Sequence, residues 1–382
     1  MAETAEERHN ATEFATAPVP CSVALIVGIT GITGLSLAEA LRSPSALGRP
    51  WTIYGVARRS PPPWFPLPAL ELFLPLDVLD LSATLRALSP LAALVTHLFY
   101  VPAAASSAEA SAEMLSNVLI ALSANSPRSS LRHVALQTGS MHYLPQLPLG
   151  GCRPPSPAPF REDAPRGSHS LFYYALEDIL QATASHSQRL TWTVHRPSVI
   201  LGASPRSEYN LLLTLAACAL ICRRERAPLV YPGNEYTWRN PCCDASDAGL
   251  LAEQQIWSAT EVVNEALNCT NGDVFSWGRL WEVVAEEFGV VHVAPGGEGW
   301  EWVERMKRKG NVWEAIVEEE GLVQTRLEEI ANFEFVYAMT NMEFEIVSCM
   351  EKSRALGFDR RVDTMESLRR WIGTMREINL IP

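Results

Sequence analysis

The feature that most constrains the fold is a glycine-rich turn near the start of the chain. Residues 22–27 read SVALIV, an aliphatic run without polar alternation, which is typical of a parallel strand covered on both faces. The sequence GITGITG follows at once, and a helix-forming segment comes after it. In such a turn the first glycine permits a tight bend, the second lets backbone N–H groups approach a pyrophosphate, and the third lets the helix pack closely on the strand. The residues expected to hold a dinucleotide here are Gly28, Thr30, Gly31, Ile32 and Gly34.

The end of the second expected strand indicates which dinucleotide is bound. Residues 51–56 (WTIYGV) form that strand, and Arg58 and Arg59 stand where an NAD-preferring fold carries an acid for the ribose 2′-hydroxyl. Guanidinium groups bind a phosphate through bidentate, charge-assisted hydrogen bonds, so the pair favours NADPH. The alternative is that both are solvated loop charges. The next strand ends in LDV, which places Asp77 and Val78 beside the adenine.

Further aliphatic runs continue the alternation of strand and helix over about two hundred residues. They lie near 95–101, 131–139 and 190–202. The pattern predicts an α/β fold, a Rossmann-like doubly wound parallel sheet with a smaller, mostly helical substrate lobe. Ligands of such sheets bind beyond the carboxyl ends of the strands. The further cofactor-binding residues expected there are Val101, Gln137, Thr138, Gly139, Pro197 and Val199.

The chain divides by pattern into a tail and two lobes. Residues 1–20 are expected to be a flexible tail, 21–205 the dinucleotide-binding domain, and 206–382 a lobe partly interleaved with it. Amphipathic helices are expected in the lobe near residues 211–224, 246–258, 276–288, 311–320 and 341–356. The stretch Leu211–Cys222 is too short for a membrane span and predicts a buried helix.

Charge and cysteine content exclude several classes of protein. The formal net charge of −12 disfavours binding to nucleic acid or to an anionic membrane surface. The 8 cysteines form neither a dense disulfide framework nor paired metal-binding motifs, so no metal site is expected. Without an export or transit signal, we expect a cytoplasmic protein with reduced thiols, a monomer or homodimer.

Several motifs together carry a family resemblance from about residue 20 to the end. They are VALIVGITGITGLSLAE, YGVARR, LQTG-x-x-HY, LFYYALEDIL, TWTVHRPS and CTNGDVFSWGRLWEVVAEEFGV. In this order they resemble the plant progesterone 5β-reductase and iridoid synthase family. Its members are atypical extended short-chain dehydrogenases/reductases that use NADPH to reduce the C=C bond of an enone or enal.

The resemblance implies that Tyr173, the first tyrosine of LFYY, is the catalytic tyrosine, and that it also borders the cofactor. Hydride arriving at the β-carbon of an enone moves charge onto the carbonyl oxygen, where a phenol stabilises it by hydrogen bonding. Tyr174 is either a helper or a decoy. Glu177 and Asp178 are interpreted as structural or solvated charges.

Met141 departs from the family pattern, because the family carries its catalytic lysine at this position. A nearby cation lowers the pKa of an acid, so its loss leaves Tyr173 closer to the ordinary phenol value of about 10. Alcohol oxidation requires the tyrosine as a base and should suffer most, whereas enone reduction needs a neutral donor. His142 is a doubtful replacement for the lysine.

The substrate pocket departs from the family as well, since Ala103 occupies the place of a tryptophan that faces nicotinamide and substrate. The resemblance places Leu147, Tyr209, Asn210 and Phe335 on the pocket wall, with core packing as the alternative for each. The proline-rich segment 151–168 is expected to form a mobile rim over the pocket. His195 is expected to be a core histidine.

These expectations favour an NADPH-dependent reductase of a small α,β-unsaturated carbonyl compound in plant specialised metabolism. Two alternatives stay open. One is a specialised relative that acts as an imine or carbonyl reductase or as a redox-neutral cyclase or isomerase. The other is a non-catalytic NADPH-binding protein.

Overall fold

A computed structural model describes most of the chain. The described residues are 22–48, 50–62, 64–65, 70–102, 107–124, 128–144, 156–167, 171–297 and 299–382. The expected tail, 1–20, lies outside them, as do Ala103, Leu147 and part of the proline-rich segment.

Seven parallel strands form the central sheet, in the order β10-β6-β5-β4-β1-β2-β3. Their bounds are β1 Ser22–Val27, β2 Trp51–Ala57, β3 Leu72–Pro75, β4 His97–Tyr100, β5 His133–Gln137, β6 Thr191–Pro197 and β10 Glu265–Cys269. The strand order reverses between β1 and β4, which is where doubly wound sheets bind their ligands. The predicted Rossmann-like sheet is confirmed.

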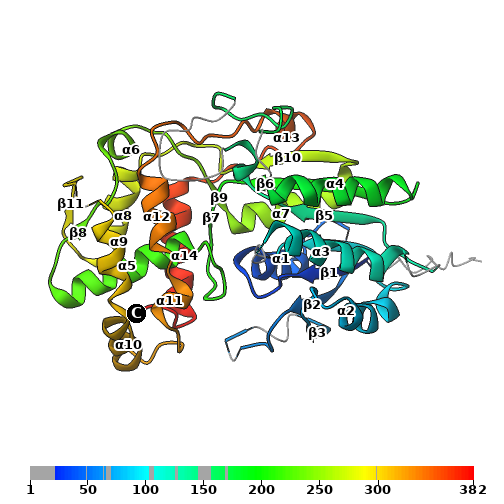
Figure 1. Cartoon of the computed structure of the whole chain (residues 1–382), viewed down its shortest axis with the longest axis horizontal. Helices are drawn as coiled ribbons and strands as arrows, with labels where there is room; N and C mark the ends of the chain where they lie inside the picture. Colours follow the sequence, from blue (N-terminus) through cyan, green and yellow to red (C-terminus); the bar gives the residue numbers. More distant parts are fainter. Residues whose placement is uncertain are drawn as a thin grey trace, which may run out of the picture.

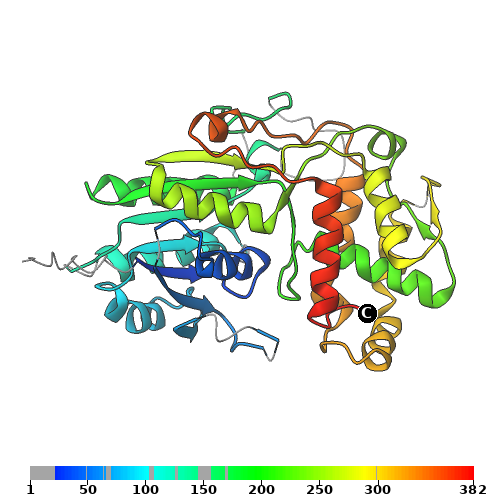
Figure 2. The same ribbon diagram turned by 180° about the vertical axis from the view of Figure 1, so that it is seen from behind.

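Helices cover both faces of this sheet (Figures 1 and 2). On one face α2 (Leu81–Leu88), α3 (Ala108–Leu119) and α4 (Phe172–Ser185) pack against alternate strand residues such as Leu25 and Val134. On the other, α1 (Ile32–Arg42) and α7 (Ala248–Glu261) pack against the intervening residues such as Ile26. Short turns of η2 (Ser89–Leu91), η3 (Ile120–Ala124) and η4 (Ser140–Tyr143) complete this half. The central strands β1, β4 and β5 are thus almost wholly buried between the two helix layers, which explains their continuous aliphatic runs, whereas the edge strand β3 is half-buried to exposed.

The remaining helices form the lobe on the left of Figure 1, except α13, which lies over β10 on the side of the sheet. They are α5 Leu211–Glu225, α6 Glu235–Arg239, α8 Trp277–Phe288, α9 Glu301–Lys307, α10 Gly310–Glu319, α11 Leu327–Ile330, α12 Phe333–Thr340, α13 Glu351–Ala355 and α14 Thr364–Glu377. The short strand pairs are β7 Val199–Leu201 with β9 Ala245–Asp247, and β8 Leu229–Val230 with β11 His292–Val293.

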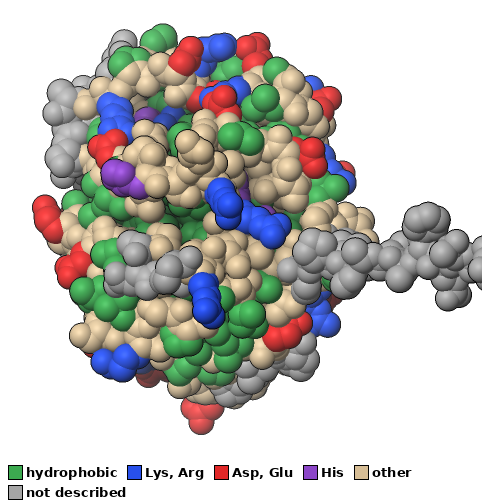
Figure 3. All heavy atoms as spheres, turned by 90° about the vertical axis from the view of Figure 1, so that its right-hand side faces the viewer, with side chains coloured by type: hydrophobic (Ala, Val, Ile, Leu, Met, Phe, Trp, Pro, Cys, Tyr) green, Lys and Arg blue, Asp and Glu red, His purple; other side chains and the backbone are tan. Residues whose placement is uncertain are grey.

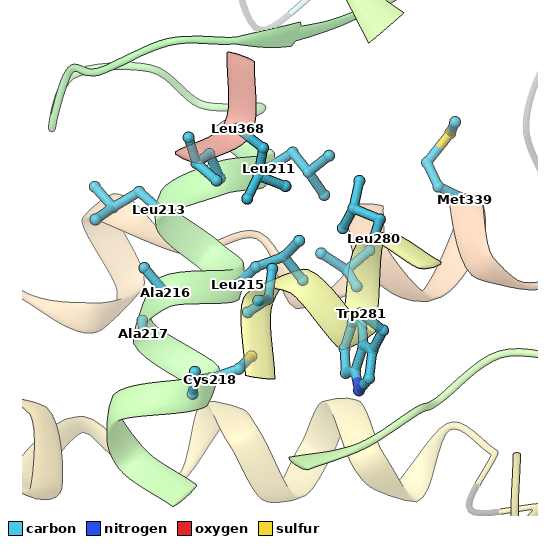
Figure 4. Close-up of a cluster of buried hydrophobic side chains, with 14 of the residues drawn as sticks. Leu211, Leu213, Leu215, Ala216, Ala217, Cys218, Leu280, Trp281, Met339 and Leu368 are labelled. Carbon is cyan, nitrogen blue, oxygen red and sulfur yellow. The ribbon is translucent and has the colours of Figure 1, made fainter. Parts of the chain in front are cut away.

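Helix α5 is the centre of the lobe core. Its residues from Leu211 to Cys218 are buried, and they face Leu280 and Trp281 of α8, Met339 of α12 and Leu368 of α14 (Figure 4). The predicted buried helix is therefore confirmed. Among the described residues, no helix combines the length and apolar character that a membrane crossing requires.

Side-chain caps define where many helices begin. In each case an Asp, Asn or Ser oxygen accepts a backbone N–H of the first turn. The capping residues are Asp80 for α2, Ser107 for α3, Asn210 for α5, Asn234 for α6, Asp247 for α7, Ser276 for α8, Asn332 for α12 and Asp363 for α14.

The helix predicted near 341–356 is wrong for most of its length. Ile346 N–H donates to the carbonyl of Cys242, and Asp244 N–H donates to the carbonyl of Ile346, so this segment pairs in extended form with residues 242–244. Only α13, at its end, is helical. Tertiary pairing overrides the apolar spacing here.

The face farthest from the lobe carries charges of both signs. Figure 3 shows basic and acidic side chains interspersed with apolar ones on this side of the molecule. It lies at the amino ends of several central strands. The candidate site lies at the opposite end, where the sheet meets the lobe.

Candidate active site

The glycine turn has the close packing that a dinucleotide site requires. Gly28 adopts φ +96°, and a Cβ added to it would lie 2.8 Å from the backbone of Pro102, directly after Val101. A Cβ on Gly34 would lie 2.3 Å from the carbonyl oxygen of Gly28. Gly31 has no side chain to cap α1, so, apart from the N–H of Ile32, which donates to Ser207 Oγ, the first turn offers its N–H groups to an anion. The turn residues therefore fit a dinucleotide phosphate.

A second segment, which sequence reasoning missed, crosses this turn. We refer to residues 203–210 as the 203–210 loop. Ser204 Oγ donates to the carbonyl oxygen of Thr30 (2.7 Å), and Ser207 Oγ accepts from Ile32 N–H (3.1 Å). The available signal was its place directly after β7, since polar loops at the carboxyl ends of parallel strands are where such folds bind ligands.

The residues expected at the adenosine end lie in two different environments. Arg58 and Arg59 are exposed directly after β2, and within the described parts of the chain neither forms an ion pair. Asp77 is also exposed. Val78 is buried, and Asn117 Nδ2 donates to its carbonyl oxygen (3.0 Å). The two arginines and Asp77 are thus accessible to a ligand through their side chains.

Tyr173 lies in the first turn of α4, against the end of β5 and β6. A Cβ added to Gly139 would lie 3.2 Å from the Tyr173 hydroxyl and 3.4 Å from the carbonyl oxygen of Pro197. Burial, with a smaller contribution from Tyr209, raises the pKa of Tyr173 well above its ordinary value. The phenol is therefore neutral at physiological pH and suited to donate a hydrogen bond.

Tyr174 has a different, structural role. Its hydroxyl donates to the carbonyl oxygen of His142 (2.8 Å) and accepts from Gly167 N–H (2.9 Å). The Arg166 guanidinium lies over its ring. Both hydrogen bonds of the Tyr174 hydroxyl are thus made to the backbone, which favours a structural role for this residue.

Met141 lies in η4 and packs against the hydrophobic core of the lobe. The neighbouring His142 is buried, with Nδ1 3.2 Å from Glu177 Oε1. Burial lowers the pKa of His142 despite that carboxylate. A neutral imidazole does not supply the positive charge that a lysine at position 141 would carry.

Glu177 anchors helix α4 to the sheet. It accepts hydrogen bonds from Arg196 Nε (3.2 Å) and Nη2 (3.0 Å) of β6. Burial alone raises the pKa of Glu177, but the hydrogen bonds from His142 and Arg196 and the positive charge of Arg196 hold it below its usual value. The structural interpretation of Glu177 is confirmed, whereas Asp178 is exposed and paired with Arg166.

Two of the expected pocket residues lie together. Tyr209 is 55% exposed, and its ring meets that of Phe335 edge-on, with centroids 5.5 Å apart. Ala103 and Leu147 lie outside the described residues.

The expectation for Asn210 requires correction. Its side chain is fully buried, with Oδ1 accepting from Leu213 N–H (3.1 Å) and Nδ2 donating to the carbonyl oxygen of Ser204 (2.6 Å). Both polar ends are therefore used to cap α5 and to shape the 203–210 loop, and Asn210 is not part of the pocket wall.

The expected rim, 151–168, is fixed at one described point. Phe160 is fully buried, stacks on Tyr143 with ring centroids 5.1 Å apart, and donates its N–H to the carbonyl oxygen of Val347 (2.7 Å). The segment is therefore attached to the lobe core at Phe160 rather than mobile there.

The remaining expected cofactor residues lie at the strand ends. Gln137 is half-buried, and its Oε1 accepts from Gln255 Nε2 (3.2 Å). Thr138 is buried, with its N–H donating to the carbonyl oxygen of His195 (2.8 Å). Val199 is buried in β7. His195 is a core residue, hydrogen-bonded to Gln254 Oε1 (2.8 Å).

Comparison with known proteins agrees with this geometry. Residues 64–382 match the PRISE-like Rossmann-fold domain. A (S)-8-oxocitronellyl enol synthase of Catharanthus roseus is 43% identical over 94% of this chain and 92% of its own. A 3-oxo-Δ(4,5)-steroid 5β-reductase of Arabidopsis thaliana is 41% identical over 94% of this chain and 93% of its own.

A solved structure supports the fold alone. The UDP-glucose 4-epimerase of Thermus thermophilus, in complex with NAD, superimposes with a TM-score of 0.59 at 16% identity. The match covers 93% of this chain and 99% of the epimerase.

Proposed function

Because the chain belongs to the PRISE-like Rossmann-fold family, we propose that it is an NADPH-dependent reductase of the C=C bond of an enone or enal. The names of the two relatives, an enol synthase and a steroid 5β-reductase, support a reaction at an unsaturated carbonyl system.

The cofactor follows from the residues at the carboxyl edge of the sheet. The close-packed glycines and the N–H groups of the first turn of α1 that follow Ile32 fit the pyrophosphate of a dinucleotide. Arg58 and Arg59, exposed and without an ion pair among the described residues, support NADPH over NADH. When bound, NADPH supplies the hydride that reduces the C=C bond.

The observation that carries the proposal is the place of the Tyr173 phenol. It lies against Gly139, just beyond the end of β5, and Gly139 in turn lies beside the carbonyl oxygen of Pro197 at the end of β6. There the hydroxyl donates a hydrogen bond to the substrate carbonyl oxygen, and the bond strengthens as negative charge develops on that oxygen. The lobe and the 203–210 loop orient the rest of the substrate.

Met141 makes the same site a poor alcohol dehydrogenase. Oxidation of an alcohol requires a base that removes the hydroxyl proton, and the buried Tyr173 with its raised pKa has no neighbouring lysine to favour its ionisation. Reduction of a C=C bond requires only the neutral phenol.

Turnover with model substrates tests the proposal. We expect NADPH oxidation with at least one of a small cyclic enone, an enal and a steroid enone, with deuterium from labelled NADPH found at the β-carbon of a product that keeps its carbonyl group. Tyr173→Phe should lower kcat about 100-fold, since one donor to a developing oxyanion is typically worth that much.

Other outcomes point to the open alternatives. An isomeric product formed without NADPH oxidation would indicate a redox-neutral cyclase or isomerase. Absence of turnover with all three compounds, together with measured NADPH binding that is indifferent to Tyr173→Phe, would indicate a binding protein and overturn the proposal.

A further inference from the structure

The 203–210 loop brings a third arginine to the two that follow β2. Arg206 Nη1 donates to the carbonyl oxygen of Ser60 (3.1 Å), and Ser60 directly follows Arg59 in the chain. Arg206 N–H donates to Ser204 Oγ (3.0 Å), whose own proton is donated to Thr30. The backbone of Arg206 is thus fixed against the glycine turn, while its side chain reaches the end of the second strand.

The positive charges at this place lack a direct counter-ion. Within the described residues, Arg58, Arg59 and Arg206 form no ion pair with a carboxylate. Partial burial and the nearby charge of Arg59 lower the pKa of Arg206. Glu329 partly opposes these charges, but its Oε1 is bonded to Arg326 Nη2 (2.7 Å) rather than to one of the three arginines. Like charges held together in this way favour the binding of an anion.

We propose that Arg206 binds the 2′-phosphate of NADPH together with Arg58 and Arg59, and that it contributes to the preference for NADPH over NADH. The proposal rests on the function proposed above. One Nη1–H of Arg206 is used by Ser60, and the other N–H groups of the guanidinium remain to bind phosphate oxygens. A phosphomonoester dianion supplies both the charge and the acceptors that three guanidinium groups require.

Arg206 could act as a ligand of the phosphate or only support the loop, and the two roles have different effects on dinucleotide affinity. A bracing residue would support the glycine turn and so affect every dinucleotide equally. A ligand of the 2′-phosphate acts only on the molecule that carries this group. Affinity for NADPH and for NADH, measured on the same variant, separates the two roles.

The test is calorimetric titration of Arg206→Gln with NADPH, NADH, 2′,5′-ADP and 5′-AMP. We expect the Kd for NADPH and for 2′,5′-ADP to rise about 10- to 100-fold, the loss typical of a charge-assisted hydrogen bond. The Kd for NADH and 5′-AMP should change by less than about 3-fold. Arg189→Gln is the matched control, since Arg189 is exposed between α4 and β6 at the opposite edge of the sheet.

The remaining outcomes decide against one proposal or the other. If Arg206→Gln leaves the Kd for NADPH unchanged while Arg59→Gln raises it, Arg206 is not a phosphate ligand and the proposed function stands. Equal losses for NADPH and NADH show bracing only. If the unaltered protein binds neither dinucleotide, or prefers NADH, both the proposed cofactor and the proposed role of Arg206 are overturned. If Arg206→Gln does not fold, Arg206→Lys is the second variant, because it keeps the charge and removes the bidentate guanidinium group. It should raise the Kd for NADPH about 3- to 10-fold and leave the Kd for NADH unchanged.

Discussion

At the scale of single residues, the absence of a side chain at Gly139 decides where the catalytic phenol lies. The Tyr173 hydroxyl occupies the space that a Cβ at position 139 would approach to 3.2 Å. Such a contact is tight, so the phenol would have to move by a few tenths of an ångström to accommodate a methyl group. The same burial that raises the pKa of Tyr173 keeps the phenol protonated across the neutral pH range.

Gly139→Ala should therefore lower kcat for enone reduction about 10- to 100-fold, because a displacement of the donor by less than about 1 Å weakens its bond to the substrate oxygen. Steady-state kinetics and thermal melting on the same sample measure this. Gly373→Ala is the control, since a Cβ there meets nothing within 4 Å and should leave kcat unchanged. A Gly139→Ala enzyme with normal kcat would show that Tyr173 is not the donor.

Met141→Lys tests what the missing lysine does. An ammonium group within about 4 to 6 Å lowers the pKa of a phenol by roughly 1 to 3 units, so alcohol dehydrogenation should gain more than about 10-fold near pH 7. Enone reduction, which uses the neutral phenol, should change by less than about 3-fold. Met141→Leu keeps the packing against the lobe core and controls for it. A rise of orders of magnitude in enone reduction would contradict the view that the present site is a competent reductase.

Sequence alone predicts the residues whose role is set by local pattern. The glycines of the turn and the arginines after β2 fall into this group. Asn210 does not, because a polar residue at a strand end serves equally as a pocket wall or as a helix cap, and only its hydrogen bonds to Leu213 and Ser204 decide. Arg206 was missed since its partner Ser60 lies 146 residues away in sequence.

At the scale of elements, the contact between α1 and β1 determines whether the cofactor site exists. Gly34 allows the helix to approach until its backbone meets the carbonyl oxygen of Gly28. A helix that lies farther from the strand would move its free N–H groups away from a bound phosphate.

We expect Gly34→Ala to raise the Kd for NADPH at least about 10-fold and to lower Tm by several degrees, because the new Cβ would lie 2.3 Å from a backbone oxygen and the helix must shift. Calorimetry and thermal melting measure the two effects. Gly310 lies at the start of α10, with nothing within 4 Å of an added Cβ. Gly310→Ala should therefore change the free energy of NADPH binding and the free energy of unfolding by less than about 1 kcal/mol. Equal melting temperatures for Gly34→Ala and the unaltered protein would refute the packing argument.

The elements that the sequence predicts well are those with a complete local signal. The strand β1 and the helix α5 have continuous apolar runs with a turn or a cap beside them. The segment near 341–356 has helical spacing too, but its backbone pairs with Cys242 and Asp244, about a hundred residues earlier. Local propensity contains no information about such a partner.

At the scale of the whole molecule, a row of three buried histidines crosses the sheet from β4 to β6. His133 Nε2 and His195 Nε2 both contact Thr193 Oγ1, at 3.0 and 3.1 Å, and the His97 ring lies 6.4 Å from that of His133. Burial lowers the pKa of His97 to about 4, of His133 to about 3 and of His195 to about 4. All three are neutral in the folded protein at physiological pH.

These three buried histidines predict a loss of stability in mild acid. Below about pH 6.5 these histidines become protonated in the unfolded chain but stay neutral in the folded protein. The free energy of unfolding therefore falls as the pH drops towards about 4. At about pH 5 the loss is roughly 2 kcal/mol per histidine. Asp244 acts in the opposite direction, since burial raises its pKa to about 7 and the folded state then holds the extra proton, but it offsets only part of the loss.

Urea unfolding between about pH 7.5 and 4.5 measures this effect. His133→Gln removes one titrating ring and should show a shallower decline over the same range, whereas His292→Gln, on the exposed strand β11, should follow the unaltered protein. A free energy of unfolding that stays flat across the acid half of this range would contradict the expectation.

The route of the chain between the sheet and the lobe limits how the enzyme can admit its substrate. After β7 the chain enters the lobe, returns to supply α7 and β10, enters the lobe again at α8, and returns at α13 to lie on β10. A hinge rotation of the lobe relative to the sheet would have to bend all these connections at once. We therefore expect substrate entry and product departure to need displacement of short segments more than rotation of the lobe on the sheet.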